Sequence, residues 1–164
     1  MRFLKVAAIA FAMLLFSFQI AVDNAQAVNV DEVYRTVTLN SEGETVVITN
    51  KQLDNGRKIF NDTCSQCHMA GRTKTNPNIT LKSEDLEGAF PSRDNVLALV
   101  DFINDPKTYD GEESIDVLHP SMSRLDLWSE MRKYNQDDLY NLAGYILVQP
   151  NLKGEQWGGG KTIN

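Results

Sequence analysis

The sequence predicts a mainly α-helical domain with one β-hairpin near its amino-terminal end and an extended carboxy-terminal tail. Several segments carry apolar residues at helical spacing, follow a Ser, Thr or Asn that can cap a helix, and stop before a Pro or Gly. Runs rich in Val and Thr lie on either side of a single turn, Asn40-Ser41-Glu42-Gly43. Strand content is therefore small.

The individual elements follow from these signals. The hairpin strands are expected over residues 35–39 and 45–48, and a helix capped by Thr49 or Asn50 is expected to reach residue 60. Later helices are expected over residues 84–88, 93–104, 124–132 and 136–148, with Ser83, Ser92 and Asn135 as caps and Pro106 and Pro150 as stops. Their inward faces are expected to consist of Val96, Leu97, Val100 and Ile103 in one helix and of Leu139, Leu142, Ala143 and Ile146 in the last helix, where Gly144 permits close approach by another backbone.

Residues 1–27 have the features of a cleaved secretory signal. Arg2 and Lys5 make a basic start, residues 6–18 are apolar, and Ala25-Gln26-Ala27 fits the small-x-small cleavage rule. The apolar run is short for a membrane span. We therefore expect export to precede folding, and the mature protein to be soluble or peripheral.

The mature chain, residues 28–164, is expected to form one domain. Its parts are an extension with the hairpin, a helical core and a tail, at residues 28–49, 50–149 and 150–164. Loss of Arg2, Lys5 and Asp23 would change the formal net charge from −6 to −7. This charge argues against a nucleic-acid partner and favours contact with basic protein surfaces, although an acidic surface kept for solubility explains it equally well.

The most informative motif is Cys64-Ser65-Gln66-Cys67-His68, which contains both cysteines of the chain and one of its two histidines. C-x-x-C-H is the pattern of c-type haem attachment. Thiols three positions apart lie about one helical turn from each other, so both can add to the vinyl groups on one edge of a haem. The sequence therefore predicts one haem c per chain, bound covalently by Cys64 and Cys67, with His68 as an axial ligand of the iron.

Two other interpretations of the motif remain open. A disulfide-exchange pair would require a strand-to-helix turn in a βαβ unit, and no such pattern surrounds Cys64. A zinc site built from Cys64, Cys67, His68 and His119 has the right number of ligands. However, Cys67 and His68 are adjacent, unlike the spaced pairs of structural zinc sites. Covalent haem is the interpretation that we favour.

The second axial ligand is expected to be His119. It is the only other imidazole of the chain, it follows the apolar pair Val117-Leu118, and Pro120 stiffens the backbone just after it. The first downstream methionine directly follows the proximal histidine and cannot reach the opposite face of the haem. That methionine is Met69, and the other candidates are Met122, Met131 and, less plausibly, a lysine amine.

Ligation by two imidazoles has consequences for the chemistry. Two imidazoles donate more electron density to iron than an imidazole and a thioether, so they favour the ferric state and lower the reduction potential. With both faces of the iron occupied, a substrate would first have to displace a protein ligand. We therefore expect a low-potential haem protein that is not an enzyme. A haem enzyme or sensor that releases His119 on demand is the weaker alternative.

The order of these parts resembles the class I cytochrome c fold, because a helix containing Gly56 precedes the haem motif and the last helix contains Tyr145. The resemblance implies that the first and last helices cross near these two residues. It also implies that the loop over residues 71–78 follows the haem motif and that the Pro77 carbonyl accepts a hydrogen bond from Nδ1 of His68.

Further motifs run over essentially the whole mature chain: Arg93-Asp94-Asn95, Thr108-Tyr109-Asp110-Gly111-Glu112, His119-Pro120-Ser121 and Trp157-Gly158-Gly159-Gly160. Together they resemble one family, the extrinsic cytochromes c-550 (PsbV) of photosystem II in cyanobacteria and some algae. The resemblance implies thioether anchors at Cys64 and Cys67 and axial iron ligands at His68 and His119.

The same resemblance implies a place on the lumenal face of the thylakoid membrane, bound to the photosystem II core and its other extrinsic subunits. There the protein would support the oxygen-evolving complex and help retain its calcium and chloride. The hairpin and the tail are the segments expected to touch the complex, although coverage of a core edge explains the hairpin equally well. Trp157 either anchors the tail in a partner or folds back onto its own domain.

A second function class stays open, that of a diffusible low-potential electron carrier of the lumen or periplasm. Ligation by two histidines and an acidic surface would serve it equally well. A carrier needs an exposed haem edge surrounded by charges that match its partner, whereas a subunit needs a larger binding face.

Overall fold

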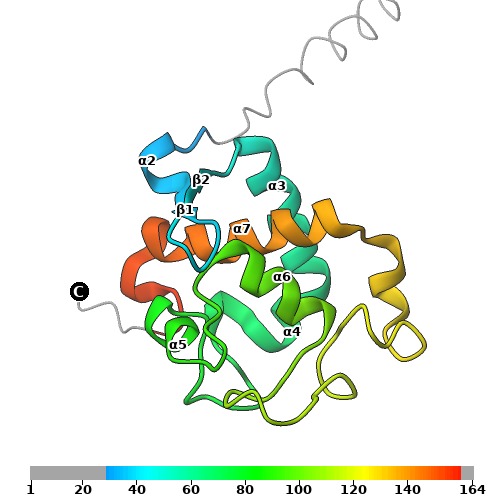
Figure 1. Cartoon of the computed structure of the whole chain (residues 1–164). Helices are drawn as coiled ribbons and strands as arrows, with labels where there is room; N and C mark the ends of the chain where they lie inside the picture. Colours follow the sequence, from blue (N-terminus) through cyan, green and yellow to red (C-terminus); the bar gives the residue numbers. More distant parts are fainter. Residues whose placement is uncertain (1–28, 160–164) are drawn as a thin grey trace, which may run out of the picture.

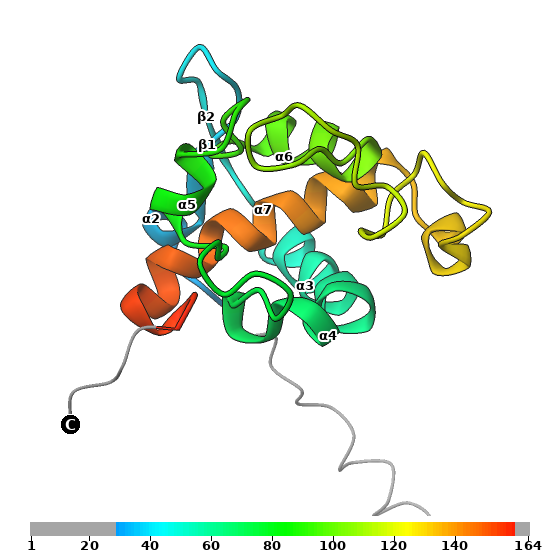
Figure 2. The same ribbon diagram turned by 90° about the horizontal axis from the view of Figure 1, so that it is seen from below.

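The computed structural model describes residues 29–159, so the expected signal and residues 160–164 lie outside the described residues. Helix α7 (Gln136–Lys153) runs through the centre of the molecule (Figure 1). Helices α3 (Asn50–Ile59) and α6 (Val96–Asn104) pack on opposite sides of α7, as Figure 2 shows. In the part of the chain that the structure describes, no helix has the length and apolar character needed to cross a membrane.

The predicted hairpin is confirmed. Strands β1 (Thr36–Thr38) and β2 (Thr45–Val47) pair antiparallel, with Val37 opposite Val46. The turn contains Gly43 at a φ of +81°, a backbone conformation that glycine adopts without steric cost. A short helix, α2 (Glu32–Arg35), precedes the hairpin. It was not predicted, because one helical turn is too short to show a hydrophobic period.

The starts of the two long crossing helices are also confirmed. Thr49 caps α3 and exchanges hydrogen bonds with Gln52, and Asn135 caps α7 in the same way with Asp138. Helix α5 (Ser83–Glu87) is present, but its cap position is Lys82, so the helix begins one residue earlier than expected.

Helices α3 and α7 cross at a glycine. A Cβ atom at Gly56 would overlap the carbonyl oxygen of Asn141 and lie 2.7 Å from Cβ of Tyr145, so only glycine lets the backbones approach this closely. The other predicted contact glycine, Gly144, makes room for the side chain of Ile48 and not for another backbone. All four residues of the predicted inward face of α7 are buried: Leu139, Leu142, Ala143 and Ile146.

Helix α6 begins later than predicted. Asn95, not Ser92, is its cap, because the Asn95 side chain accepts a hydrogen bond from the backbone N–H of Ala98. The later start changes which residues point inward. Leu99 is buried, whereas Leu97, which we expected in the core, is 44% exposed.

The helix predicted over residues 124–132 was wrong. The segment consists of turns and a 3-10 helix, Ser129–Lys133. Leu125 in the turns, Trp128 before the 3-10 helix and Met131 within it are buried or half-buried, so these apolar side chains pack inward without an α-helix.

Helix α7 passes the stop predicted at Pro150 and ends at Lys153. A proline inside a helix removes one hydrogen bond and costs about 3 kcal/mol. Burial of the apolar side chain of Val148 on the preceding turn offsets part of this cost.

The tail then folds back onto the helices. After a 3-10 helix, Gly154–Gln156, Trp157 is only 1% exposed, and its ring centroid lies 5.6 Å from that of Phe60 and 6.4 Å from that of Tyr145. Its indole N–H donates to the carbonyl of Leu81 at 2.8 Å. Of the two roles open for Trp157, the structure shows the intramolecular one, and the described part of the tail is more compact than expected.

Candidate haem-binding site

The haem motif lies where α3 changes its geometry. The helix runs into a single π-helical turn, Phe60–Cys64, and then into α4 (Ser65–His68). The N–H of Ser65 donates to the Phe60 carbonyl, which is the wider bond of a π turn, and such turns are frequent at functional sites. The turn places Cys64 half-buried against the core, while Cys67 is exposed.

The chain reverses direction directly after the motif, in the short 3-10 turn Met69–Gly71. Ala70 has a φ of 54° and Gly71 a φ of +81°. A Cβ atom at Gly71 would lie 2.7 Å from the ring of Trp157. Both the positive φ and this lack of space therefore require glycine at position 71. The N–H of Gly158 donates to the Ala70 carbonyl at 2.8 Å. The packed tail therefore contacts the turn that directly follows the haem motif and stabilises it.

The structure brings His68 and His119 together. Their ring centroids lie 6.1 Å apart, with an angle of 58° between the ring planes. A bond from an imidazole nitrogen to a metal is about 2.0 Å long, so rings on opposite sides of one ion have centroids about 6 Å apart. The observed separation therefore fits one metal ion between the two imidazoles.

The surroundings of His119 also suit a porphyrin. Val117 and Leu118, which precede it, are 53% and 79% exposed, so they offer apolar surface beside the ring. The methionines are placed less well for binding iron. Met131 lies in the core and Met122 packs against it. Two free thiols, two facing imidazoles and an apolar flank together fit a c-type haem.

The orientation of the His119 ring is fixed by its neighbours. Its Nδ1 lies 2.9 Å from the Pro120 carbonyl, and because a carbonyl can only accept, Nδ1 carries the proton. The lone pair is then on Nε2, which is free to bind a metal. The ring of Phe102 packs against the imidazole edge-on, at 5.0 Å between centroids, and limits its rotation.

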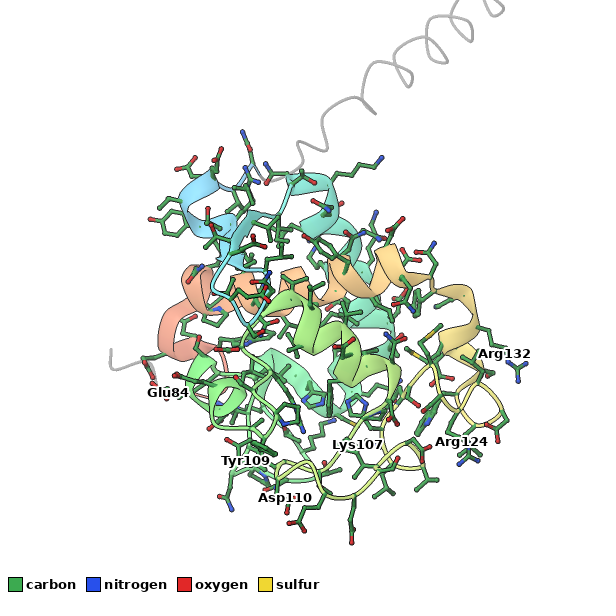
Figure 3. The ribbon with its side chains drawn as sticks, in the orientation of Figure 1. Glu84, Lys107, Tyr109, Asp110, Arg124 and Arg132 are labelled. Carbon is green, nitrogen blue, oxygen red and sulfur yellow. The ribbon has the colours of Figure 1, made fainter. Side chains whose placement is uncertain are left out.

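Arg93 supports Phe102 from the other side. Its guanidinium carbon lies 4.0 Å from the centroid of the Phe102 ring. The same group donates to the carbonyls of Lys107 at 3.1 Å and Thr108 at 2.6 Å. Figure 3 shows Lys107 on the loop that leaves the end of α6. Sequence reasoning missed this role, since the only signal was the motif at residues 93–95.

Both imidazoles are held in the uncharged form that binds metals. The pKa of His119 is lowered to about 4, mainly by burial and next by the neighbouring His68. The hydrogen bond of His119 to the Pro120 carbonyl raises this pKa by less than His68 lowers it. Burial also lowers the pKa of His68. At neutral pH both rings are therefore available as neutral ligands.

The structure rejects the disulfide-exchange interpretation. Burial, and then the charge of Cys67, raise the pKa of Cys64 to about 12, whereas a disulfide-exchange cysteine has a lowered pKa. The motif also follows a helix, and in residues 29–159 the only strands are the two of the hairpin. The zinc interpretation gains no support either, because within that range no three His, Cys, Asp or Glu side chains gather closely enough to hold a metal ion.

The hydrogen-bond partner of Nδ1 of His68 differs from the one that the family resemblance implies. The hydroxyl of Thr73, not the carbonyl of Pro77, lies 3.2 Å from Nδ1 of His68. The reason is local: the N–H of Lys74 donates to the Cys67 carbonyl at 2.9 Å, which turns the loop back early and brings Thr73 beside the ring. Nothing in the residue type of Thr73 marked it for this role.

Comparison with known proteins identifies the family. Residues 28–164 match the family model described as cytochrome c-550 domain. The chain belongs to the cytochrome c-550 family. Its relatives of known structure have the class I cytochrome fold predicted from the sequence, and membership of a cytochrome family implies a haem cofactor.

Individual members of the cytochrome c-550 family are similar over most of the chain. The photosystem II extrinsic protein V of Picosynechococcus sp. is 52% identical over 153 residues, which cover 93% of this chain and 89% of that protein. The crystal structure of cytochrome c549 has a TM-score of 0.76 at 48% identity, over 78% of this chain and 99% of its own. The PsbV2 cytochrome from Thermosynechococcus elongatus has a TM-score of 0.63 at 33% identity, over 75% of this chain and 87% of its own.

Proposed function

We propose that this protein is a low-potential c-type cytochrome with two histidine ligands and an extrinsic, lumenal subunit of photosystem II. In this role it stabilises the oxygen-evolving complex and the retention of its calcium and chloride. The observation that carries the haem part is the juxtaposition of His68 and His119, with ring centroids 6.1 Å apart next to two free cysteines. The association rests on the relatives named photosystem II extrinsic protein V.

Each site residue has a defined role in this proposal. Cys64 and Cys67 bind one haem through thioether bonds, and His68 and His119 provide neutral nitrogen ligands from opposite sides. The haem supplies one-electron redox chemistry when bound. The Pro120 carbonyl holds the His119 ring in the tautomer that presents Nε2, and Phe102 limits the rotation of that ring. Ligation of this kind keeps the potential low and leaves no open position for a substrate, so we propose no enzymatic activity.

The proposed location follows from the sequence and the family together. Residues 1–27 act as the export signal, and the mature protein is held peripherally on the lumenal side of the thylakoid membrane by protein partners, not by a span of its own. No nucleic acid is a partner, because a chain with a formal net charge of −6 repels a polyanion.

One experiment tests cofactor and partner together. Photosystem II is purified from the host without high salt, its subunits are separated, and the band of this chain is assayed for covalent haem by the absorption of its pyridine haemochrome. We expect a haem-bearing band that copurifies with the complex and leaves it on a high-salt wash. A colourless chain would overturn the haem assignment, and a haem-bearing chain found only in the soluble fraction would favour a diffusible electron carrier.

A further inference from the structure

The hairpin and the outer face of α6 line a groove that contains none of the predicted haem-binding cysteines and histidines, although it shares Arg93 and Phe102 with the surroundings of His119. Its volume is about 1010 Å³, and its walls include the hairpin turn, the segment before α6 and the exposed side of α6. In Figure 2 the hairpin projects away from the helical body beside α6. The two walls are joined, since the N–H of Leu97 donates to the Leu39 carbonyl at 3.0 Å.

The hairpin wall is held in shape by its own hydrogen bonds. Oδ1 of Asn40 accepts from the backbone N–H groups of Glu42 and Glu44, both at 3.2 Å. The amide nitrogen of the same side chain donates to the Glu44 carboxylate at 2.7 Å. The groove is therefore a formed surface, which lowers the entropy cost of binding a partner.

The charge of the groove is mainly negative. Four carboxylates line it, those of Glu42, Asp94, Asp101 and Asp105, together with two cations, Arg93 and Lys107. Both cations are engaged by other groups. Arg93 donates to two backbone carbonyls, and Lys107 pairs with Asp105 at 3.0 Å. Among the ion pairs of residues 29–159, none involves Glu42, Asp94 or Asp101.

An apolar side chain lies among these carboxylates. Leu97 is 44% exposed and lines the groove. Asp101 is four residues further along α6, so the two side chains share one face of the helix. The buried residues of α6, Val96, Leu99 and Ile103, occupy its other face.

We propose that this groove docks a basic segment of a partner protein, with lysine or arginine side chains against Asp94, Asp101 and Glu42 and one apolar side chain against Leu97. Charge complementarity selects this occupant, because unpaired carboxylates on a formed wall attract cations and repel nucleic acids and anionic lipid headgroups. The inference deepens the proposed function, on which it rests: the basic segment belongs to a photosystem II subunit.

The test measures rebinding of the purified haem protein to photosystem II particles from which the extrinsic subunits have been washed. The double variant Asp94→Asn/Asp101→Asn removes two groove charges. Its matched control, Glu84→Gln/Glu87→Gln, removes two exposed charges of α5 that neither line the groove nor belong to the ion pairs of residues 29–159. We expect the groove variant to bind about three- to tenfold more weakly at low salt and to lose part of its salt dependence, while the control binds as the unaltered protein does.

A second pair of variants tests the apolar contact. Leu97→Ala should weaken binding, whereas Leu127→Ala, at a side chain that is 50% exposed in the turns before the 3-10 helix Ser129–Lys133, should not. Carbodiimide cross-linking of the unaltered complex should join Glu42, Asp94 or Asp101 to a lysine of the partner. Equal binding by the groove variants and their controls would overturn the docking proposal alone. Failure of the unaltered haem protein to rebind at any salt concentration would overturn the photosystem II assignment, and the docking proposal with it.

Discussion

Gly56 in α3 lies directly against the backbone of Asn141 in α7, so closely that a Cβ atom at position 56 would overlap the Asn141 carbonyl oxygen. This contact fixes the distance between the two helices on which the haem motif depends, because the π turn that carries Cys64 continues α3. A backbone cannot move aside as a side chain can. A larger residue at the crossing therefore requires one of the two backbones to shift.

Gly56→Ala is expected to destabilise the protein by about 1–3 kcal/mol, measured as the free energy of unfolding in denaturant. The higher helix propensity of alanine contributes about 1 kcal/mol in the opposite direction, and the overlap with a backbone outweighs it. The matched variant is Gly144→Ala, whose Cβ would meet the Cδ1 atom of Ile48 at 2.6 Å, the far end of a side chain. We expect a smaller loss there, and an equal loss in both variants would contradict this account of the crossing.

Trp157→Ala is expected to cost about 3–5 kcal/mol of stability, since it removes a large buried side chain from contact with Phe60 and Tyr145. Trp157→Phe keeps most of the packing and loses the hydrogen bond to the Leu81 carbonyl, at a cost of about 1 kcal/mol. Chemical denaturation of both variants checks the two values. If Trp157 instead anchored the tail in a partner, the isolated alanine variant would keep its stability and fail only in assembly.

The parts of the fold that sequence predicted well are those that local chemistry determines. The hairpin follows from its turn residues, the starts of α3 and α7 from Thr49 and Asn135, and the haem motif from five adjacent residues. Gly56 and Tyr145 were placed correctly at the helix crossing only through the resemblance to class I cytochromes.

The parts that sequence did not predict depend on contacts between distant segments. The helix signal before α6 pointed to Ser92, but in the fold the adjacent Arg93 side chain binds two carbonyls of a later loop and Asn95 becomes the cap. Likewise, the contacts of Arg93 with Phe102 and of Phe102 with His119 join α6 to the loops on either side of it, which no periodic pattern relates. The proline stop in α7 failed because burial of Val148 on the turn before Pro150 outweighs local propensity.

His119→Met should retain the covalent haem and raise the reduction potential, because a thioether donates less electron density to iron than an imidazole. A redox titration monitored by visible absorption measures the change. Leu127→Met is the matched control: it places a thioether on an exposed side chain outside the site and should leave the potential unchanged. An unaltered potential in the His119 variant would show that another residue binds the iron.

Cys64→Ser should leave one thioether bond, lower the yield of mature haem protein and alter the pyridine haemochrome spectrum. Cys67→Ser removes the other bond and should give the same class of spectrum. The two variants should differ in stability, since Cys64 packs against the core and Cys67 is exposed. A normal yield and spectrum in either variant would exclude that cysteine as a haem anchor.

Arg93→Gln is expected to lower the reduction potential, the opposite direction from His119→Met. The guanidinium lies over the Phe102 ring, which packs against His119. Burial is the main cause of the lowered pKa of His119, and the positive charge of Arg93 adds to it in the same direction. A positive charge that disfavours protonation of the imidazole also disfavours the additional positive charge of ferric iron. Removing it should shift the potential downward by an amount on the order of tens of mV.

The variant Arg93→Lys separates this charge effect from the structural role of the guanidinium. Lysine keeps the positive charge but lacks the planar fork that donates to the carbonyls of Lys107 and Thr108. It should therefore keep most of the potential and lose stability, by about 1–3 kcal/mol for carbonyls left without a donor. If the lysine variant instead shifted the potential as far as the glutamine variant did, the reduction potential would depend on the position of the loop that carries His119 and not on the charge of Arg93.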